Sequence, residues 1–426
     1  MTNYAPEYSK LEKRKQTGIQ QICRTILLGQ FKKMSESQLR MTLEDGNTMS
    51  FGDTRKQSAH AHITVLDPKF YERSVLYGAI GFAESYIDGE WTTDNLTNVI
   101  EWFIYNNTNS TVLEESKNKS IFINPLLMLN RVGHILRDNT LKMSKKNIEE
   151  HYDLGNDFFN LILDETMTYS SAIFENRHES LAEAQRRKVE RLCQKLQLTA
   201  KDEVLEIGCG WGFFAVHAAK NYGCKMRCVT LSDQQFAFVT DLVRREKLEH
   251  LITVEICDFR NVKGKYSKIV SIEMVEALGD SKVDIFFDCC NRLLEPNGIL
   301  AIQMITTPDC RYDVLKNGVD FIQKHIFPGS QLLSVERVLK ALNKCSTLHL
   351  VDLHDFAASY AWTLSSWREN FLANLDAIRD LGFDDRFIRK WIYYFCYCEA
   401  AFATRQISVV QVVFARPNNE VLAGKL

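Results

Sequence analysis

The sequence predicts an α/β fold built on a largely parallel sheet, preceded by a smaller α+β unit. Three observations support this prediction. Short β-rich runs alternate with helical segments from residue 201 onwards. A glycine-rich turn follows the first of these runs and precedes a helical segment. Nearer the N-terminus, a period-two pattern with an Asp-Gly turn indicates a hairpin instead. Alternating strands and helices build βαβ units, whose sheets are parallel.

The composition is that of an ordinary globular protein. The 426 residues carry 52 Lys and Arg against 54 Asp and Glu, a net charge of −2, and 45% of them are hydrophobic. This balance disfavours disorder, and we predict no nucleic-acid partner. The 12 cysteines show no C-x-x-C spacing, so we predict no metal site, no disulfides and a cytoplasmic location. No apolar run approaches the ~20 residues that span a bilayer, so we expect membrane contact to be peripheral.

The first part of the chain predicts a helix followed by a hairpin. Apolar residues between Leu11 and Phe31 have the spacing of an amphipathic helix. Residues 39–43 then alternate apolar and polar up to the turn at Asp45-Gly46, which is typical of a hairpin. We assign residues 1–106 to this helix and a small α+β domain.

Residues 107–147 predict a linker. This stretch opens with the polar run NTNSTVLEESKNKS and closes with five basic residues against the single acid Asp138. The basic end at 131–146 suits contact with an anionic membrane, and a solvated linker explains it equally well. Both interpretations stay open.

The remaining chain predicts a single large domain over residues 148–417, with a tail at 418–426. The expected helices cover 213–221 and 234–247. The expected strands cover 203–207, 225–231, 251–257, 268–272, 298–305 and 408–415. Residues 306–405 are predicted to be mostly helical and to shape a substrate site. An aromatic stripe runs through them, and it fits either a core or an acyl channel. Its members are Trp362, Trp367, Phe371, Trp391, Ile392, Phe395 and Phe402.

The glycine turn indicates a nucleotide-like cofactor. Gly208, Gly210 and Gly212 follow a strand and precede a helix, where the absence of Cβ atoms lets a ligand approach the backbone. The dinucleotide fingerprint requires a sixth-place glycine, but Phe213 stands there, so NAD and FAD are disfavoured. The G-x-G-x-G form resembles motif I of class I S-adenosylmethionine methyltransferases.

Polar residues at the next strand ends support this interpretation, because open α/β sheets bind ligands at the carboxyl edge of their strands. The second strand ends near Thr230 and Gln235, and the fourth ends in Ser-Ile-Glu-Met-Val-Glu276. The third strand ends at Asp258 and Phe259, an acid for an adenine amine and an aromatic face for its ring.

Longer motifs resemble the cyclopropane-fatty-acyl-phospholipid synthases and their mycolic-acid methyltransferase relatives. These motifs are HYDLGNDFF at 151–159, MTYSSAIF at 167–174 and FIQKHIFPG at 321–329. The resemblance covers about residues 60–417. It implies a Rossmann-like class I methyltransferase sheet with helical substrate-binding insertions, preceded by a small α+β domain. It also implies S-adenosylmethionine as cofactor, a phospholipid acyl substrate and, as in some relatives, a homodimer.

The resemblance also implies site residues. Glu206 is expected to organise the glycine turn. The expected cofactor contacts are Tyr169, Ser170, Glu206, Gly208, Gly210, Gly212, Thr230, Leu231, Gln235, Asp258 and Phe259. In this family a bound bicarbonate is thought to remove the proton that follows methyl transfer. Glu276, Tyr360 and the main chain of Ile305 match its ligands, although a helix-start acid and a core aromatic would also explain the first two.

The chain departs from the family pattern at three places. Ser171 replaces the usual Cys, Gln303 replaces the usual His, and Ala277 follows Glu276 where His is usual. The Ser171 amide and the Gln303 side chain can still donate hydrogen bonds. The loss of His removes the obvious proton relay near neutral pH, so methyl transfer is better supported than ring closure.

Three functions remain open on the sequence. The first is methyl or methylene transfer to the cis double bond of an unsaturated phospholipid acyl chain. The second is N-methylation of a lipid headgroup or a small amine, because plant alkaloid N-methyltransferases share these motifs. The third is a lipid-binding scaffold without activity.

Overall fold

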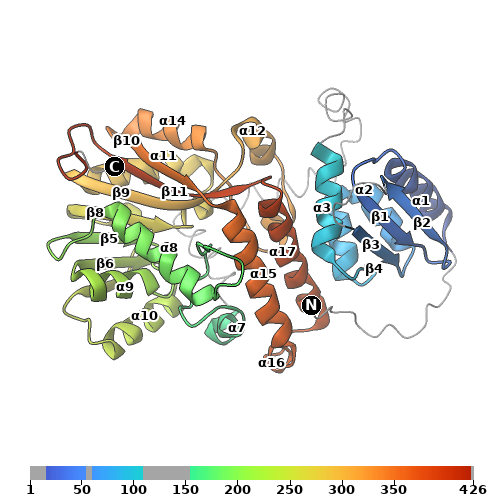
Figure 1. Ribbon diagram of the computed structural model, residues 1–426, viewed down its shortest axis with the longest axis horizontal. Helices are drawn as coiled ribbons and strands as arrows, with labels where there is room; N and C mark the ends of the chain where they lie inside the picture. The colour runs from blue at the N-terminus through green and yellow to red at the C-terminus, as the bar shows by residue number, and fades with distance from the viewer. Residues whose placement is uncertain (1–15, 54–59, 109–153, 424–426) are drawn as a thin grey trace.

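The computed structural model describes residues 16–53, 60–108 and 154–423, which form two units, each with its own sheet (Figure 1). The N-terminal unit contains α1 (Gly18–Phe31), α2 (Lys69–Ile87) and α3 (Leu96–Thr108). Its four strands are β1 (Gln38–Thr42), β2 (Thr48–Gly52), β3 (His60–Val65) and β4 (Trp91–Thr92), in the order β2-β1-β3-β4. β1 and β2 pair antiparallel across Asp45-Gly46, so the predicted hairpin is confirmed.

Local sequence explains where the N-terminal helices begin and bend. Thr17 and Gln20 form a capping box that starts α1. Gly78, with φ +58°, interrupts α2. The period-two pattern of β1 and β3 buries Leu39, Met41 and Ile63 against the helices, at 0% exposure. These contacts close a small core beneath α1, α2 and α3.

The second unit is built on a seven-stranded sheet in the order β10-β11-β9-β8-β5-β6-β7. The neighbouring strands from β9 through β8, β5 and β6 to β7 all pair in parallel. β11 pairs antiparallel with both of its neighbours, β9 and β10. The strands are β5 (Glu203–Ile207), β6 (Lys225–Thr230), β7 (Ile252–Ile256), β8 (Tyr266–Ile272), β9 (Leu294–Thr306), β10 (His349–Asp355) and β11 (Ser408–Ala415). This is the predicted parallel-dominated α/β fold.

Helices cover both faces of this sheet (Figure 1). One layer holds α8 (Leu181–Leu196), α9 (Phe213–Tyr222) and α10 (Asp233–Arg245); the other holds α11 (Asp280–Leu293) and α14 (Val335–Cys345). α8 begins at the Ser180–Glu183 capping box, and α10 begins at Ser232, which caps the Gln235 amide. The shorter helices near the site are α7 (Gly155–Ile162), α12 (Asp309–Asn317), α13 (Phe321–His325) and α16 (Leu375–Asp380).

Two long helices join the units. α15 (Ala357–Ala373) packs against α17 (Asp385–Ala403), and α17 also packs on α2 and α3. Between the units, Arg389 donates from Nε to the Tyr86 carbonyl at 2.6 Å and from a terminal nitrogen to the Trp91 carbonyl at 2.9 Å. Lys324 and His325 contact Glu84 at 2.7 and 2.9 Å. One continuous apolar core therefore runs from α1 to α17.

Two strands were not predicted, the two-residue β4 and the longer β10. Residues 306–405 are mostly helical as expected, but they include β10, a half-exposed edge strand with the sequence HLVDLHD. Its polar residues hid the strand pattern, and only pairing with β11 defines it. The expected linker at 107–147 lies almost wholly outside the described residues. Leu422, in the expected tail, packs into the second unit at 8% exposure. Among the described residues, no helix combines the length and apolar character needed to cross a bilayer.

Candidate active site

A cavity of 1530 Å³ joins the carboxyl edge of the large sheet to the N-terminal unit. At one end it is lined by the glycine turn and the ends of β6, β7 and β8. At the other end its walls are apolar side chains of α1, α2 and α3, together with α13 and α17. That wall includes Leu27, Phe31, Phe82, Ile100, Phe103, Ile322 and Phe402. Since single-ligand pockets are usually about 300–1,000 Å³, this cavity has room for a cofactor and a second molecule.

The glycine turn presents backbone to the cavity at Gly208 and Gly210. Gly208 has φ +82°, and a Cβ there would lie 2.8 Å from the Met274 side chain. Gly210 has φ +52°, and a Cβ there would meet nothing within 4 Å. Gly212 does not line the cavity; a Cβ there would lie 2.7 Å from Val239 of α10. Glycine is therefore required at these positions for different structural reasons, and of the three only Gly208 and Gly210 line the cavity.

The neighbouring strand ends bring the other predicted cofactor residues to the same edge. Thr230 donates its hydroxyl to the Gln235 side chain at 2.8 Å, and both line the cavity beside Leu231. Asp258 and Phe259 line it too. Both carboxylate oxygens of Asp258 accept from the Arg260 guanidinium, at 2.8 and 2.7 Å. A ligand amine would therefore share Asp258 with Arg260.

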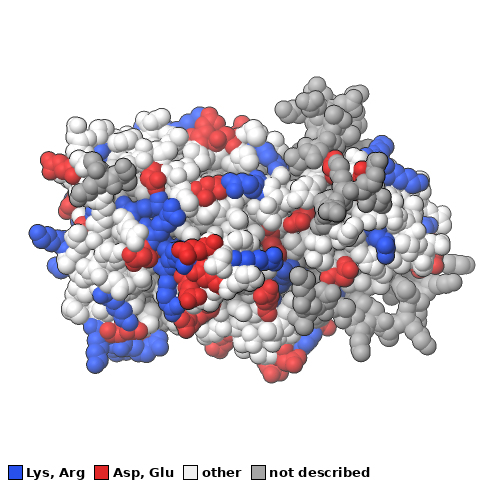
Figure 2. Space-filling view, in the orientation of Figure 1, with Lys and Arg blue, Asp and Glu red and all other residues white. Residues whose placement is uncertain are grey.

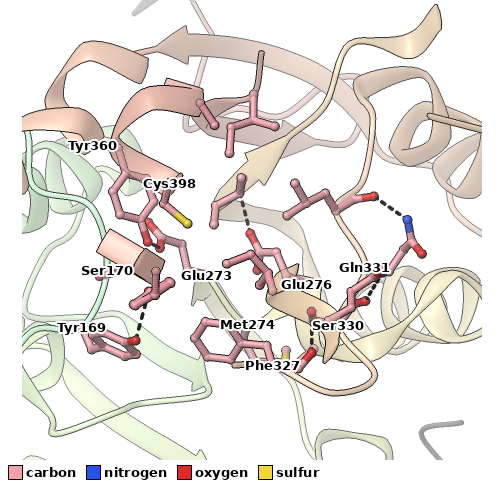
Figure 3. A pocket seen from close by; sticks show the side chains of 18 of the residues that line it. Tyr169, Ser170, Glu273, Met274, Glu276, Phe327, Ser330, Gln331, Tyr360 and Cys398 are labelled. Carbon is pink, nitrogen blue, oxygen red and sulfur yellow. Dashed lines mark hydrogen bonds between the residues drawn. The ribbon is translucent and has the colours of Figure 1, made fainter. Parts of the chain in front are cut away.

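The segment 167–174 is held against the sheet edge by two helices. α15 supplies the Thr363 and Ser359 hydroxyls, which accept from the amides of Ala172 and Phe174 at 3.1 Å each. α8 supplies Lys188, whose ammonium donates to the Ser170 hydroxyl at 2.8 Å. These bonds place Tyr169 and Ser170 in the cavity wall, facing the strand ends (Figure 3).

The described part of the HYDLGNDFF motif braces the glycine turn. The Trp211 indole donates to Asn156 of α7 at 2.9 Å, and its ring lies 4.9 Å from that of Phe159. Phe158 and Phe159 are fully buried. The motif therefore holds the glycine turn in place through its contacts with Trp211. Residues 151–153 of the motif lie outside the described residues.

Three buried residues surround the carboxylate of Glu273, a partly buried residue that sequence reasoning did not include. Its Oε1 accepts the Ser171 amide at 2.9 Å and the Gln303 side-chain amide at 2.7 Å. Its Oε2 accepts the Tyr360 hydroxyl at 2.6 Å (Figure 3). Five residues were expected to surround a bicarbonate ion. Three of them, Ser171, Gln303 and Tyr360, do lie together, but they bind the Glu273 carboxylate.

The other two expected residues contact each other. Glu276 accepts the Ile305 main-chain amide through Oε1, whereas its Oε2 is buried and has no hydrogen-bond partner among the described residues. Both residues line the cavity. Burial, and then the charge of Glu273, raise the pKa of Glu276 to about 8. A buried carboxyl oxygen without a hydrogen-bond partner costs free energy unless a ligand in the cavity binds it.

The electrostatics of the cavity favour a cationic ligand. Burial raises the pKa of Glu206 to about 8, and its side chain accepts from the Cys228 thiol at 3.5 Å rather than capping the turn. Burial also lowers the pKa of Lys188 to about 8. A positive charge placed among Glu206, Glu273 and Glu276 would favour their ionised forms. A sulfonium ion meets that requirement.

Two charged residues that line the cavity, Lys188 and Glu273, were not predicted, and each had a sequence signal. Lys188 stands on the apolar face of α8, in line with Ala184 and Leu192, where an unpaired lysine is costly. Glu273 stands in the same SIEMVE run as Glu276. Six of the seven stripe members are buried in the core and Trp362 is partly buried, and only Phe402 among them lines the cavity. Tyr393, Tyr394 and Tyr397 line it instead.

Comparisons with known proteins agree with this geometry. Residues 139–412 match the family model described as mycolic acid cyclopropane synthetase. The chain is 35% identical to the tuberculostearic acid methyltransferase UfaA1 of Mycobacterium tuberculosis, over 89% of this chain and 88% of that protein. It is 35% identical to the cyclopropane-fatty-acyl-phospholipid synthase of Escherichia coli, over 84% of this chain and 89% of that protein.

A solved structure has a similar fold. The mycolic acid cyclopropane synthase CmaA1, complexed with SAH and CTAB, is 29% identical. It superposes with a TM-score of 0.59 over 63% of this chain and 97% of that one. The family model covers more than half of this chain, and the glycine turn and strand ends suit the cofactor. The chain therefore belongs to the mycolic acid cyclopropane synthetase family and is an S-adenosylmethionine-dependent methyltransferase.

Proposed function

We propose that this enzyme acts on lipid and transfers a methyl group to the cis double bond of an unsaturated phospholipid acyl chain. The observation that carries the proposal is the shape of the cavity, which joins a cofactor-binding sheet edge to an apolar channel. Burying each CH₂ group of an acyl chain in such a channel contributes about 0.8 kcal/mol. Similarity to the Escherichia coli and Mycobacterium tuberculosis relatives supports the same substrate class.

The residues between the two ends of the cavity suit the chemistry. S-adenosylmethionine, when bound, would supply an electrophilic sulfonium methyl group, and its transfer to an alkene would leave a carbocation. Glu273 and Glu276 line the cavity there, alongside Tyr360. Fixed carboxylates in a buried site stabilise developing positive charge more strongly than water does, because they need not reorient during the reaction.

The apolar channel also weighs against a small-amine acceptor, which would leave the side chains of α1, α2 and α3 without an apolar partner. A scaffold without activity would not need buried carboxyls at the sheet edge. We therefore place the double bond near Glu273 and Glu276 and the rest of the acyl chain towards Phe82 and Phe103.

Labelled S-adenosylmethionine separates these functions. The pure protein would be incubated with the labelled cofactor and vesicles of mixed unsaturated phospholipids, and the products fragmented by mass spectrometry. We expect the label in the acyl chain, as a cyclopropane or methylene carbon. Resistance to mild hydrogenation distinguishes the first product from the second. Label on the headgroup, or no transfer at all, would contradict the proposal.

Gly210→Ala tests the cofactor end of the cavity. The added Cβ meets no protein atom but enters the space where the ligand would approach the turn. We expect the dissociation constant for S-adenosylmethionine to rise by about tenfold or more, or about 1.4 kcal/mol, by calorimetry. The matched control is Gly46→Ala at the hairpin turn, because Gly46 also has a positive φ, +85°, and its Cβ would likewise meet nothing within 4 Å. Equal affinity in both variants would refute the placement of the cofactor.

The same cavity suggests how lipid enters. α1 lines it with Leu27 and Phe31, while Ile19, Ile22 and Ile26 on the outer face are 59%, 62% and 46% exposed. On the face drawn in Figure 2, described Lys and Arg side chains lie beside Asp and Glu side chains over the large unit, and the N-terminal unit shows fewer of either. We place peripheral membrane contact on this isoleucine face. The basic segment 131–146 lies outside the described residues, and the dimer remains a prediction.

Charged replacements on α1 test this contact. Ile22→Glu with Ile26→Glu should weaken binding to anionic phospholipid vesicles by about tenfold or more, because burying one isoleucine contributes about 1.5–3 kcal/mol. Flotation of protein with vesicles measures this binding. Ile285→Glu is the matched control, since Ile285 is 40% exposed on α11 of the other unit. Vesicle binding that is unchanged in the double variant would contradict the assignment.

A further inference from the structure

The carboxylate of Glu273 occupies a complete set of anion-binding donors. The donors come from three separate elements: the Ser171 amide, the Gln303 side chain on β9 and the Tyr360 hydroxyl on α15. Gln303 is held in turn by Gln411 of β11, which donates to its carbonyl oxygen at 3.1 Å. The donors are therefore preorganised, and an anion among them needs no rearrangement of the protein.

A separate bicarbonate ion does not fit this arrangement. Three of the groups that would bind it already bind Glu273, and the Ile305 amide is taken by Glu276. A carboxylate and a bicarbonate share the same planar pair of oxygens, so the side chain reproduces the ion's acceptor geometry.

The backbone at Glu273 indicates that its position is selected for function. Glu273 has φ +48°, in the left-handed region that costs a residue with a Cβ about 1–2 kcal/mol. Its amide donates to the Gln303 carbonyl at 2.8 Å, which fixes this turn directly after β8. Glycine would adopt this conformation without strain. The presence of glutamate despite the strain therefore indicates that its side chain is needed at this position. Glu273 is also only partly buried, and it lines the cavity.

We propose that Glu273 is the proton acceptor of the reaction, a base within the chain that replaces an external bicarbonate. The inference rests on the acyl methylation proposed above. Lys188 supplies a buried positive charge near this carboxylate, and Tyr360, Gln303 and Ser171 orient it. These groups are positioning residues, whereas Glu273 contacts the transferred carbon.

The step is balanced without a further reactant. The alkene π pair forms a bond to the methyl carbon, and the carbon–sulfur pair leaves with the sulfur. Glu273 then takes one proton from the transferred methyl group. The released C–H pair either closes a cyclopropane with the cationic carbon or, after a hydride shift, forms a methylene double bond. In both cases the carboxylate becomes a neutral acid, and no oxidant or reductant is consumed.

Bicarbonate dependence tests this role. Reactions with labelled S-adenosylmethionine and unsaturated phospholipid vesicles would be run in CO₂-free buffer, with and without added bicarbonate. We expect the wild-type enzyme to turn over equally well in both. Glu273→Gly should lose activity by about 100-fold or more in CO₂-free buffer and recover part of it with bicarbonate, which can occupy the vacated donors. Glu273→Gln should lose activity equally and not recover, because its amide fills the space without basicity.

Two controls separate this role from folding. Lys247→Gly makes the same backbone change at an exposed residue with φ +58°, away from the cavity, and should retain wild-type activity. Calorimetric binding of S-adenosylmethionine shows whether each Glu273 variant is folded. Wild-type dependence on bicarbonate, near-wild-type activity of Glu273→Gly in CO₂-free buffer, or no recovery of that variant would each overturn the inference. Wild-type enzyme that labels no acyl chain under any condition would refute the proposed function instead.

Discussion

Glu276→Gln is expected to slow acyl methylation by about 100-fold, a typical cost of removing one preorganised group that stabilises transition-state charge. Glutamine keeps the size of the side chain but carries no charge. The lost group is Oε2, the buried oxygen that has no protein partner within the described chain. The turnover number should fall more than the affinity for the cofactor, because the charge matters most when the carbocation forms.

The same substitution should stabilise the protein at alkaline pH. The pKa of Glu276 is raised from 4.5 to about 8, so the folded state binds more protons than the unfolded state between these values. Wild-type stability therefore falls as the pH rises through this window. Glutamine cannot ionise, so the stability difference in favour of the variant should grow from about pH 5 to pH 8.

Turnover and thermal unfolding, each followed across this pH range, check both expectations. Glu249→Gln is the matched control, because Glu249 is exposed on the large unit and does not line the cavity. It should leave both quantities unchanged. Near-wild-type turnover of Glu276→Gln would remove Glu276 from the chemistry. A stability difference that shrinks with rising pH would contradict the raised pKa.

Arg389→Met should destabilise the protein by about 3 kcal/mol, because it leaves two buried carbonyl groups without donors. Arg389 is 5% exposed, binds the Tyr86 and Trp91 carbonyls and stacks on the Tyr86 ring at 4.5 Å. Its loss should also loosen the N-terminal unit from α17. Since α1, α2 and α3 line the apolar end of the cavity, acyl methylation should fall while cofactor affinity is retained.

Arg386→Met is the control on the same helix and at the same junction. Arg386 is 65% exposed and pairs with Asp88 at 2.7 Å, and an exposed pair of this kind contributes no more than about 1 kcal/mol. Urea unfolding measures the two stabilities, and calorimetry measures cofactor binding. Equal stability of the two variants would show that the buried contacts of Arg389 do not hold the units together.

The strands of the large sheet could be predicted because their signals are local. β5 and β11 have the predicted bounds, and β6, β7 and β8 differ from prediction by a residue or two at their ends. Continuous apolar runs bounded by turn residues identify such buried strands. β10 could not be predicted in this way, because an edge strand with one exposed face carries polar residues and depends on its partner β11 for definition.

In the candidate site, too, the features with local sequence signals could be predicted, whereas those that depend on tertiary contacts could not. The fold class, the cofactor and the chemistry could be predicted from the glycine turn, the polar strand ends and the family motifs. Each of these signals consists of a few consecutive residues. Only the tertiary structure decided which glutamate of the SIEMVE run receives the donors. Ser171, Gln303 and Tyr360 lie 102, 30 and 87 residues away from Glu273, so they meet it only once the sheet and α15 have packed. Hydrogen bonds act over about 3 Å in space, whatever the separation along the chain.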